Sequence, residues 1–184
     1  MESHVAATPP RAVDYSSFDW RFRQLLEALP AAVYTTDAEG RLTFYNQAAV
    51  EFSGRRPELG SDRWCVSWRL YRPDGTFLPH DECPMAIALK EDRPIRGVEA
   101  VLERPDGTRI HFIPFPTPLY DASGALIGAV NMLVDISEQK SAEEVQQRLN
   151  EILERRVEQR TREISETLAR LRISEERFRL LVQG

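Results

Sequence analysis

The sequence is poor in cysteine and has no long hydrophobic run. Its two cysteines, Cys65 and Cys83, form neither a disulfide framework nor the spacing of a metal site. No apolar stretch of about 18 residues or more is present, and the first residues lack the charged-then-apolar order of a secretory signal. We therefore expect no membrane segment in this chain, no bound metal, and a reducing, cytoplasmic location.

Sequence features of catalysis and of nucleic-acid binding are missing as well. No Gly-rich nucleotide-binding box occurs, and none of the three histidines lies beyond His111, so the C-terminal part has no phosphoacceptor histidine. The formal net charge is -5, from 24 Lys and Arg against 29 Asp and Glu, which disfavours a general nucleic-acid binder. This chain is therefore expected to be no enzyme by itself and to bind no nucleic acid.

The N-terminal half combines short helices with a hairpin. Apolar residues at helical spacing predict a helix over about residues 17–29. Two apolar runs predict a β-hairpin over residues 32–45, with Gly40 as the left-handed turn residue. Asn46 is then suited to cap a short helix that ends at Gly54.

The next part is mainly strand-like. Residues 55–80 show no clean period, apart from a small hairpin predicted around Asp74-Gly75, and a helix follows with Pro84 in its first turn. Three further runs then predict an antiparallel meander over residues 97–104, 109–119 and 125–134. This order of elements predicts an α+β fold, with one antiparallel sheet and short helices on one face.

Three prolines alternate within one predicted strand, at Pro114, Pro116 and Pro118. Alternate residues of a strand direct their N–H groups to the same side, so one edge of this strand lacks three donors. A central strand does not tolerate that loss. Either the sheet ends early near residue 114, or its rim is left open there as a feature of the fold; the first interpretation is the simpler one.

Two segments resemble the PAS family. Residues 25–54 are similar to the first hairpin and helix of a PAS domain, and residues 103–140 are similar to its last two strands. Asp135-Ile136-Ser137 resembles the Asp-Ile-Thr signature that ends PAS cores, which makes these residues the expected signal junction. The segment between resembles PAS modules of bacterial sensor histidine kinases. The resemblance covers about residues 22–140 and implies a five-stranded antiparallel sheet, a small-molecule cavity in many members, and frequent dimerisation.

The resemblance also implies an interior cavity between the sheet and the helices. Asn131 interrupts an apolar strand, on the face predicted to carry Ile127, Ala129 and Leu133. Its amide would contact either a ligand or another polar group beside the sheet. The candidate lining residues are those that PAS topology would place around the interior: Val33, Phe44, Met85, Leu89, Val101, Ile113, Asn131 and Leu133.

No cofactor is firmly indicated. Cys65 does not lie in the Asn-Cys-Arg-Phe-Leu-Gln-like motif of flavin photosensors, so a small buried hydrophobe is the better interpretation and a covalent flavin is disfavoured. Heme is disfavoured because neither His80 nor His111 is predicted to lie on a pocket helix. The ligand-type residues 80–83 are consecutive, which suits the start of a helix better than a metal site.

A helix-forming stretch without Gly or Pro occupies residues 138–182, and its residues repeat every seven positions. The predicted a positions are Asn150, Val157, Ile164, Leu171 and Phe178, and the d positions are Leu153, Arg160, Thr167, Ser174 and Leu181. Such a helix spans roughly 65 Å and cannot bury this seam on one small domain. We therefore expect a parallel homodimeric coiled coil, with the N-terminal helix as a second contact.

An alternative is a single solvated helix stabilised by ion pairs. Glu precedes Arg by four residues at 144/148, 151/155, 158/162, 166/170 and 175/179. A basic zipper is disfavoured, since acidic residues interleave every basic cluster.

The sequence therefore predicts a disordered tail over 1–16, a PAS sensory domain over 17–137 and a coiled-coil signalling helix over 138–182. "RFRLLV" at 177–182 resembles "RFRQLL" at 21–26, which predicts that the helix leads into a second PAS domain. The favoured function is a dimeric sensory module that relays a ligand or partner signal to an effector, a histidine kinase in two-component signalling. The alternatives are a relay to another effector, such as a cyclic-dinucleotide enzyme, and a ligand-free dimerisation module.

Overall fold

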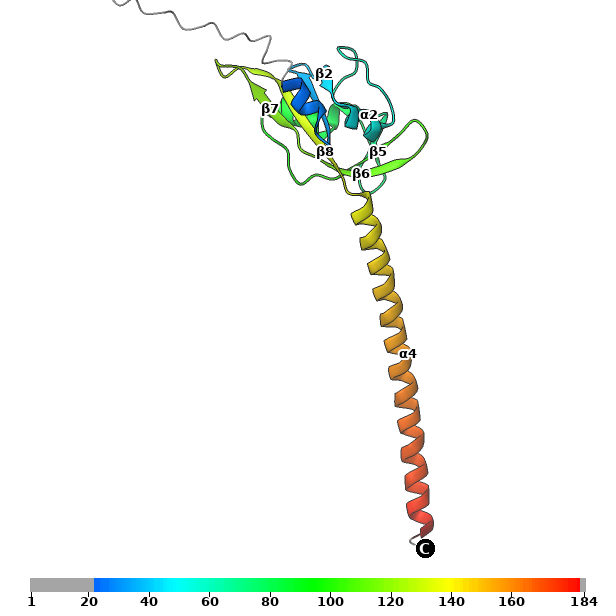
Figure 1. Cartoon of the computed structure of the whole chain (residues 1–184). Helices are drawn as coiled ribbons and strands as arrows, with labels where there is room; N and C mark the ends of the chain where they lie inside the picture. Colours follow the sequence, from blue (N-terminus) through cyan, green and yellow to red (C-terminus); the bar gives the residue numbers. More distant parts are fainter. Residues whose placement is uncertain (1–21, 183–184) are drawn as a thin grey trace, which may run out of the picture. The chain divides into compact units, whose positions relative to one another are not determined.

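A computed structural model describes residues 22–182 of the chain (Figure 1). The predicted tail and the first five residues of the predicted N-terminal helix lie outside this range, and residues 22–27 are helical. The chain divides between Ile136 and Ser137 into two units, each of which is described by itself.

One antiparallel sheet forms the centre of the first unit. Its strands are β1 (Ala32–Asp37), β2 (Leu42–Tyr45), β3 (Arg69–Tyr71), β4 (Phe77–Leu78), β5 (Ala100–Glu103), β6 (Arg109–Pro114), β7 (Thr117–Tyr120) and β8 (Leu126–Asp135). Their order is β2-β1-β8-β6-β5-β3-β4, and β7 also pairs with β8. The sheet has more strands than the five predicted, because the β3–β4 hairpin extends it beyond β5 and because the fourth predicted strand is broken into β6 and β7.

Short helices pack on one face of this sheet, as predicted for an α+β fold. They are α2 (Gln47–Ser53), the 3₁₀ turn η1 (His80–Glu82) and α3 (Pro84–Lys90). Asn46 caps α2 and Gly54 ends it in the left-handed conformation, both as predicted. The hydrophobic core combines α3 with alternate residues of the strands, including Tyr34 and Phe112.

The two copies of "RPDGT" form the same turn. In Arg72–Thr76 and in Arg104–Thr108, the Arg N–H donates to the Thr carbonyl at 2.8 Å and the Gly N–H donates to the Arg carbonyl at 2.9 Å. The first copy connects β3 to β4, and the second connects β5 to β6. The repetition therefore reflects hairpin chemistry, and the small hairpin predicted around Asp74-Gly75 is confirmed.

The alternating prolines lie where the sheet ends on one side. Strand β5 pairs with β6 only as far as Phe112. The N–H of Phe115 donates to the carbonyl of Met132 in β8 at 2.9 Å, so Pro114 and Pro116 direct their missing donors to the opposite side, where β5 has already ended. The interpretation that the sheet ends early near residue 114 is confirmed.

Strand β8 is irregular at Gly128, and this corrects one predicted face. Gly128 has a φ of 152°, and a Cβ at this position would lie 1.9 Å from the carbonyl oxygen of Thr36. In the residues of β8 that precede Gly128 the side-chain alternation is shifted. Leu126 therefore packs against the core, while Ile127 is 52% exposed. The prediction that Ile127 shares a face with Ala129 is therefore wrong, because a glycine irregularity changes the period of two.

The turn between β7 and β8 is held by the carboxylate of Asp121. Its Oδ1 accepts the hydroxyl of Ser123 at 2.6 Å, the N–H of Ser123 at 2.8 Å and the N–H of Ala125 at 3.0 Å. These hydrogen bonds, that of the Ser123 hydroxyl above all, hold the pKa of Asp121 below its ordinary value of 3.8. The carboxylate therefore stabilises the fold above its unfolded-state pKa, and this contribution is lost as pH falls through the lower folded-state pKa.

Asp121→Ala should lower stability near neutral pH and flatten the loss of stability on acidification below the ordinary Asp pKa of 3.8. Asp121→Asn is the matched control, because its amide oxygen still accepts hydrogen bonds but does not titrate. Urea unfolding followed by circular dichroism at several pH values measures both effects. Equal pH dependence in wild type and both variants would contradict the assignment.

The second unit is one continuous helix, α4 (Ser137–Val182), of 46 residues. It is drawn from yellow to red in Figure 1. From Ser141 to Glu175 all of its side chains are exposed in the single chain. No helix within residues 22–182 has the length and apolar character that a membrane crossing requires.

Candidate functional site

The structure brings four of the predicted pocket residues to the core side of the sheet. Met85 and Leu89 of α3 and Leu133 of β8 belong to one buried cluster. Asn131 lies two residues before Leu133 and is 2% exposed. These four residues can surround a common interior, so a ligand-lining role for them stays a prediction.

The other four predicted pocket residues lie on the opposite face of the sheet. Val33, Val101 and Ile113 are each adjacent in their strand to a residue that packs in the core, and successive strand residues point to opposite faces. Phe44 pairs with Thr35, next to the core residue Tyr34, because a register shift separates it from Leu42. Two of the four are nevertheless buried, so both faces of these strands carry apolar residues and hydropathy does not indicate which face is interior. The alternation therefore places Val33, Phe44, Val101 and Ile113 on the face of the sheet away from Met85, Leu89 and Leu133.

A buried hydrogen-bond chain connects the sheet to the loop before β3. The Nδ2 of Asn131 donates to the hydroxyl of Tyr34 at 2.9 Å, and that hydroxyl donates to the carbonyl of Trp64 at 3.0 Å. The Oδ1 of Asn131 accepts the N–H of Phe115 at 2.9 Å. Of the two roles open to Asn131, the structure thus shows the contact with polar groups beside the sheet. We call Asn131, Tyr34 and Trp64 the core polar chain.

The thiols near the core polar chain are held neutral by burial. Burial raises the pKa of Cys65, whose Sγ lies 3.0 Å from the Oγ of Ser67. Burial raises the pKa of Cys83 to about 12. The pKa of Tyr34 is also raised, first by burial and then by the two thiols, so its hydroxyl keeps the proton that it donates. Cys65 therefore acts as a small buried residue, as predicted, and neither thiol has the lowered pKa of a reactive cysteine.

Trp64 has an uncommon backbone conformation for a large residue. Its φ is 69°, in the left-handed region, which costs free energy in a residue with a bulky Cβ substituent. Its N–H donates to the carbonyl of Gly40 at 2.7 Å, and its indole packs so closely on Gly40 that a Cβ there would lie 2.2 Å from the ring. The fold thus fixes Trp64 from two sides, through Gly40 and Tyr34.

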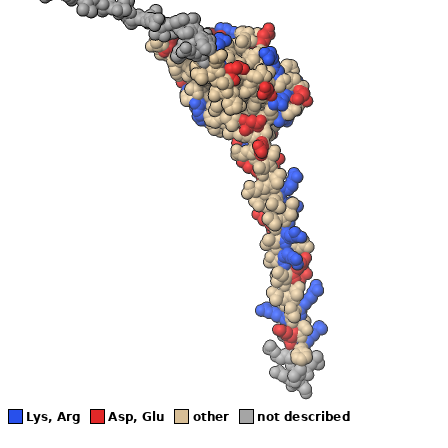
Figure 2. All heavy atoms as spheres, viewed as in Figure 1, with Lys and Arg blue, Asp and Glu red and all other residues tan. Residues whose placement is uncertain are grey.

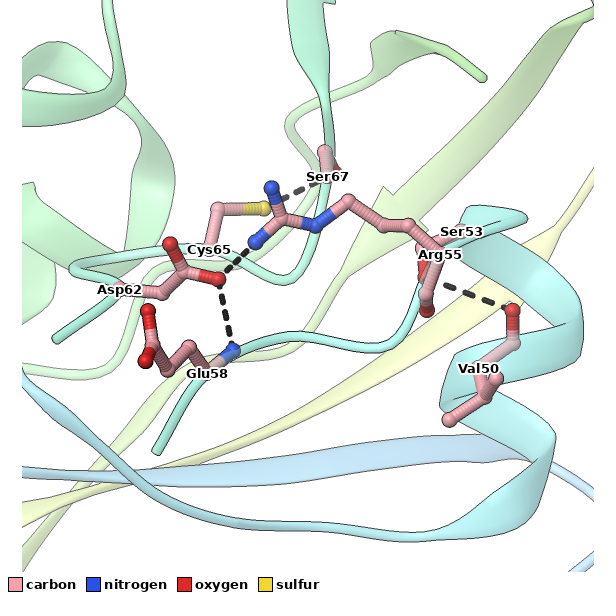
Figure 3. A network of polar contacts seen from close by, with 7 residues as sticks. All are labelled: Val50, Ser53, Arg55, Glu58, Asp62, Cys65 and Ser67. Carbon is pink, nitrogen blue, oxygen red and sulfur yellow. Dashed lines mark hydrogen bonds and ion pairs between the residues drawn. The ribbon is translucent and has the colours of Figure 1, made fainter. Parts of the chain in front are cut away.

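A cleft of about 480 Å³ opens beside Trp64. Its lining residues come from the loop after α2 and from η1: Arg55, Ser61, Asp62, Arg63, Trp64, Cys65, Ser67, Trp68, His80 and Asp81. Figure 3 shows the guanidinium of Arg55 directed at the carboxylate of Asp62, which also accepts the N–H of Glu58 at 2.9 Å. We call this feature the Arg55 cleft.

Two side-chain nitrogens of the Arg55 cleft are enclosed and have no hydrogen-bond partner among the described residues. They are Nε of Arg55 and Nε2 of His80, which come from separate elements. Burial first, and then the nearby charge of Arg55, lowers the pKa of His80, so its ring is neutral at neutral pH. An enclosed polar atom without a partner is costly and needs an explanation.

The sequence did not predict that these residues form a common cleft. Residues 80–83 were considered for metal binding and Cys65 for flavin, but Arg55 and Asp62 were not singled out. The loop that carries these two residues has no regular period, and the 3₁₀ turn that carries His80 is remote in sequence. Within the described part of the chain, no group of three His, Cys, Asp or Glu side chains is arranged to hold a metal ion.

The predicted signal junction lies where β8 ends. Asp135 is the last residue of β8 and lines, together with Arg104, a separate surface cleft of about 430 Å³. Ile136 is buried, and its N–H donates to the carbonyl of His111 at 2.8 Å. Ser137 begins α4. The last strand thus continues into the long helix with one residue between them.

Comparison with known proteins agrees with this architecture. A family model described as a PAS fold matches residues 26–141, more than half of the chain. The chain belongs to the PAS family. The PAS fold predicted from the resemblance is thereby confirmed, together with the long C-terminal helix. Comparison with curated proteins gives no match for this PAS protein.

Solved structures are similar to this PAS protein in fold. An RNA-binding light-oxygen-voltage receptor matches over 81% of this chain at 12% identity with a TM-score of 0.52; this chain covers 41% of that protein. The PAS domain of the fruit-fly ELK potassium channel matches over 68% of this chain and 98% of its own, at 12% identity and a TM-score of 0.51. A light-oxygen-voltage domain studied with a flavin analogue matches over 73% of this chain and 98% of its own, at 16% identity and a TM-score of 0.51. At these sequence identities the similarity shows a shared fold and does not indicate a bound cofactor.

Proposed function

We propose that this PAS protein is a sensory module that forms a parallel homodimer through α4 and relays a signal to an effector. The effector is proposed to be a histidine kinase of a two-component system, on the resemblance of the central segment to PAS modules of such kinases. The observation that carries the proposal is the row of exposed apolar side chains on α4. Val157, Ile164, Leu171 and Phe178 are 63%, 59%, 53% and 69% exposed in the single chain.

These side chains lie seven residues apart, which places them on one slowly drifting stripe of a straight helix. Large apolar residues exposed in such a row are typical of a helix that packs against another helix. A parallel partner copy would bury each of them against its own equivalent. The predicted seam residue Leu181 is helical, but its side chain lies outside the described part of the chain.

Ion pairs do little to stabilise α4 as a lone helix. Of the five predicted Glu-to-Arg pairs, Glu151–Arg155 approaches to 3.9 Å among the described side chains. Exposed pairs of this kind contribute only about 0.3–0.5 kcal/mol each. Figure 2 shows acidic and basic side chains interspersed along the visible face of α4, without a basic block. The ion-pair alternative is therefore weaker than association with a partner helix.

Helix α4 carries two overlapping seams rather than one. With Val157, Ile164 and Leu171 as a positions, the d layers hold Arg160, Thr167 and Ser174. With the same three residues as d positions, the a layers hold Thr161, Leu168 and Glu175 instead. Exposed Leu168 belongs to this second seam, which the sequence prediction did not consider.

The two seams differ by a rotation of about 50° around the helix axis, since each residue advances the helix by about 100°. Each seam has polar layers, so neither packing has a large advantage in free energy. A relay needs such a small difference, because a sensed ligand supplies only a few kcal/mol of bias. A static spacer has no need of it.

Strand β8 provides a physical route from the core to α4. It carries Asn131 of the core polar chain and, four residues later, Asp135 at the junction. A shift of Trp64 or Tyr34 would therefore act on the strand that leads into the helix. This continuity supports a relay.

A second candidate is a dimerisation module that binds no ligand. It is favoured by the core polar chain, in which Tyr34 and Asn131 satisfy each other instead of presenting free polar groups to a ligand. Native mass spectrometry of the purified chain separates the two candidates. A bound small molecule supports sensing, and an empty chain that dimerises supports the dimerisation module.

Asp135→Ala should leave the PAS fold intact but uncouple it from an effector fused after α4. Asp135 is exposed at the end of β8, so its loss costs little packing. We expect the thermal unfolding midpoint to shift by only a few degrees, while the effector loses most of its response. Asp74→Ala, in the β3–β4 turn, is the matched control. A fused effector that responds normally in Asp135→Ala would leave Asp135 without a role in coupling.

A further inference from the structure

The Arg55 cleft has the features of a ligand site that neither the family match nor the similar structures assign. We infer that it binds a small aromatic monocarboxylate. The inference deepens the proposed sensory role, since it names a ligand class, and it rests on that role only for its biological meaning. Binding itself is a property of this chain and is tested without an effector.

The first contact is the guanidinium of Arg55. One of its nitrogens, Nη2, pairs with Asp62, as Figure 3 shows, while Nε is enclosed and unpartnered among the described residues. A guanidinium presents its donors in one plane and binds the two oxygens of a carboxylate side by side. Asp62 thus engages one nitrogen of the group, and the enclosed Nε is a donor without an acceptor among the described residues, so a carboxylate that enters the cleft has to displace the atoms that cover it.

The second contact is the imidazole of His80. Its Nε2 is enclosed and unpartnered, and its ring lies close enough to Arg55 to sense the guanidinium charge. The charged groups near the ring are Arg55, Asp62 and Asp81. A carboxylate bound between Arg55 and His80 would give both nitrogens a partner, with the imidazole donating once it takes up a proton. One ligand group therefore accounts for two unpartnered atoms from two elements.

The residues that line the cleft indicate which chemical group the ligand carries besides its carboxylate. Trp64 and Trp68 both line the cleft, and Trp68 is 48% exposed although it is a large aromatic residue. The Trp64 ring already packs on Gly40 and has Arg63 and Lys90 over it. The exposed indole of Trp68 is therefore the surface for an aromatic ring, which prefers offset-stacked or edge-to-face contact. A volume of about 480 Å³ lies within the range of small-molecule sites.

The charge of the lining decides against a polyanion. Arg55 and Arg63 supply two positive charges, and Asp62 and Asp81 supply two negative charges. Lys90 adds one further positive charge beside the cleft, since its Nζ donates to the carbonyl of Asp81 and lies 5.9 Å from the centre of the Trp64 ring. The surplus of positive charge is matched by one carboxylate and exceeded by a phosphate dianion, so the cleft favours a monocarboxylate.

Titration of the full 184-residue chain with benzoate tests the inference. The indole N–H signals of Trp64 and Trp68, assigned by Trp→Phe variants, report on the cleft in NMR spectra. We expect both signals to shift and to saturate at benzoate concentrations on the order of 1 mM. Benzyl alcohol, which lacks the carboxylate, and inorganic phosphate, which lacks the ring, should each bind at least about tenfold more weakly.

Two variants should change the affinity for benzoate in opposite directions. Arg55→Gln should weaken binding by roughly tenfold or more, because it removes the charged donor. Asp62→Asn should tighten binding several-fold, because it removes the competing carboxylate while its amide oxygen still accepts the N–H of Glu58. Exposed Arg93→Gln is the matched control and should have no effect.

An absence of indole shifts with benzoate would overturn the inference. So would equal binding by wild type and Arg55→Gln, or weaker binding by Asp62→Asn. If Arg55→Gln fails to fold, Asp62→Asn still decides, since a damaged fold does not bind more tightly. Failure in any of these ways removes the carboxylate site but leaves dimerisation and relay through α4 untouched.

Discussion

Replacing Arg160, Thr167 and Ser174 together with leucine should tighten the dimer by at least about 100-fold. Each substitution converts a polar layer of the first seam into an apolar one, and a buried leucine contributes roughly 1 kcal/mol or more per layer. Sedimentation equilibrium of the wild-type and variant chains measures the change. An effector fused after α4 should at the same time stop responding, because the helix pair is held in one packing.

The second seam provides the matched variant. Thr161→Leu with Glu175→Leu strengthens the alternative packing, in which Leu168 is already apolar. If the two packings correspond to two output states, the two variants should fix the fused effector in opposite states while both tighten the dimer. A tighter dimer with undiminished switching in both variants would refute the relay and leave α4 as a tether.

Asn46→Ala should lower the free energy of unfolding by about 3 kcal/mol or more. Asn46 is fully buried, and its Oδ1 accepts the N–H groups of Val33 at 3.0 Å and of Ala49 at 2.9 Å. Its Nδ2 donates to the carbonyls of Leu26 at 3.0 Å and Ala31 at 2.8 Å. Alanine removes all four of these side-chain hydrogen bonds, whereas the N–H of Ala49 and the carbonyl of Leu26 keep backbone partners.

Urea unfolding followed by tryptophan fluorescence measures this loss, and two variants serve as controls. Asn46→Ser keeps a side-chain oxygen that can cap α2 but loses the amide nitrogen, so its stability should lie between wild type and Asn46→Ala. The neighbouring Gln47→Ala is exposed and should change stability by less than about 0.5 kcal/mol. A loss in Asn46→Ala no larger than that in Gln47→Ala would contradict the central structural role of Asn46.

Local chemistry made the elements around Asn46 predictable. An Asn before an apolar run is typical of a helix N-cap, and Asn46 caps α2. A Gly after a helix or in a tight turn is typical of the left-handed conformation, which Gly54 and Gly40 both adopt. The small hairpin around Asp74-Gly75 was predictable for the same reason. The family resemblance supplied the fold, and the matched residues 26–141 agree with it.

The faces of the strands were not predictable in the same way. Both faces of β1 and β5 are buried in places, so Val33 and Val101 carry no signal that distinguishes the core side from the other side. Gly128 then shifts the alternation within β8 through a backbone contact with Thr36, which only the folded chain contains. A pattern of period two fails wherever such an irregularity intervenes.

The Arg55 cleft was beyond the reach of sequence patterns for a different reason. Arg55, Trp64 and His80 come from an irregular loop and a 3₁₀ turn, and no periodicity relates them. Their juxtaposition depends on the left-handed conformation of Trp64, which a tryptophan does not indicate by its identity. Tertiary contacts with Gly40 and Tyr34 hold it in place.

The most direct test of the account is a disulfide cross-linking scan along α4, with single cysteines from Arg156 to Arg172. Cys65 and Cys83 can stay, because both are buried with raised pKa values. A parallel dimer predicts that Val157→Cys, Ile164→Cys and Leu171→Cys cross-link most efficiently, each to its own equivalent. A further maximum of cross-linking at Thr167→Cys would show that the first seam is in use, and one at Leu168→Cys would show the second. Cross-linking that is absent, or equal at all positions, would contradict the parallel coiled coil.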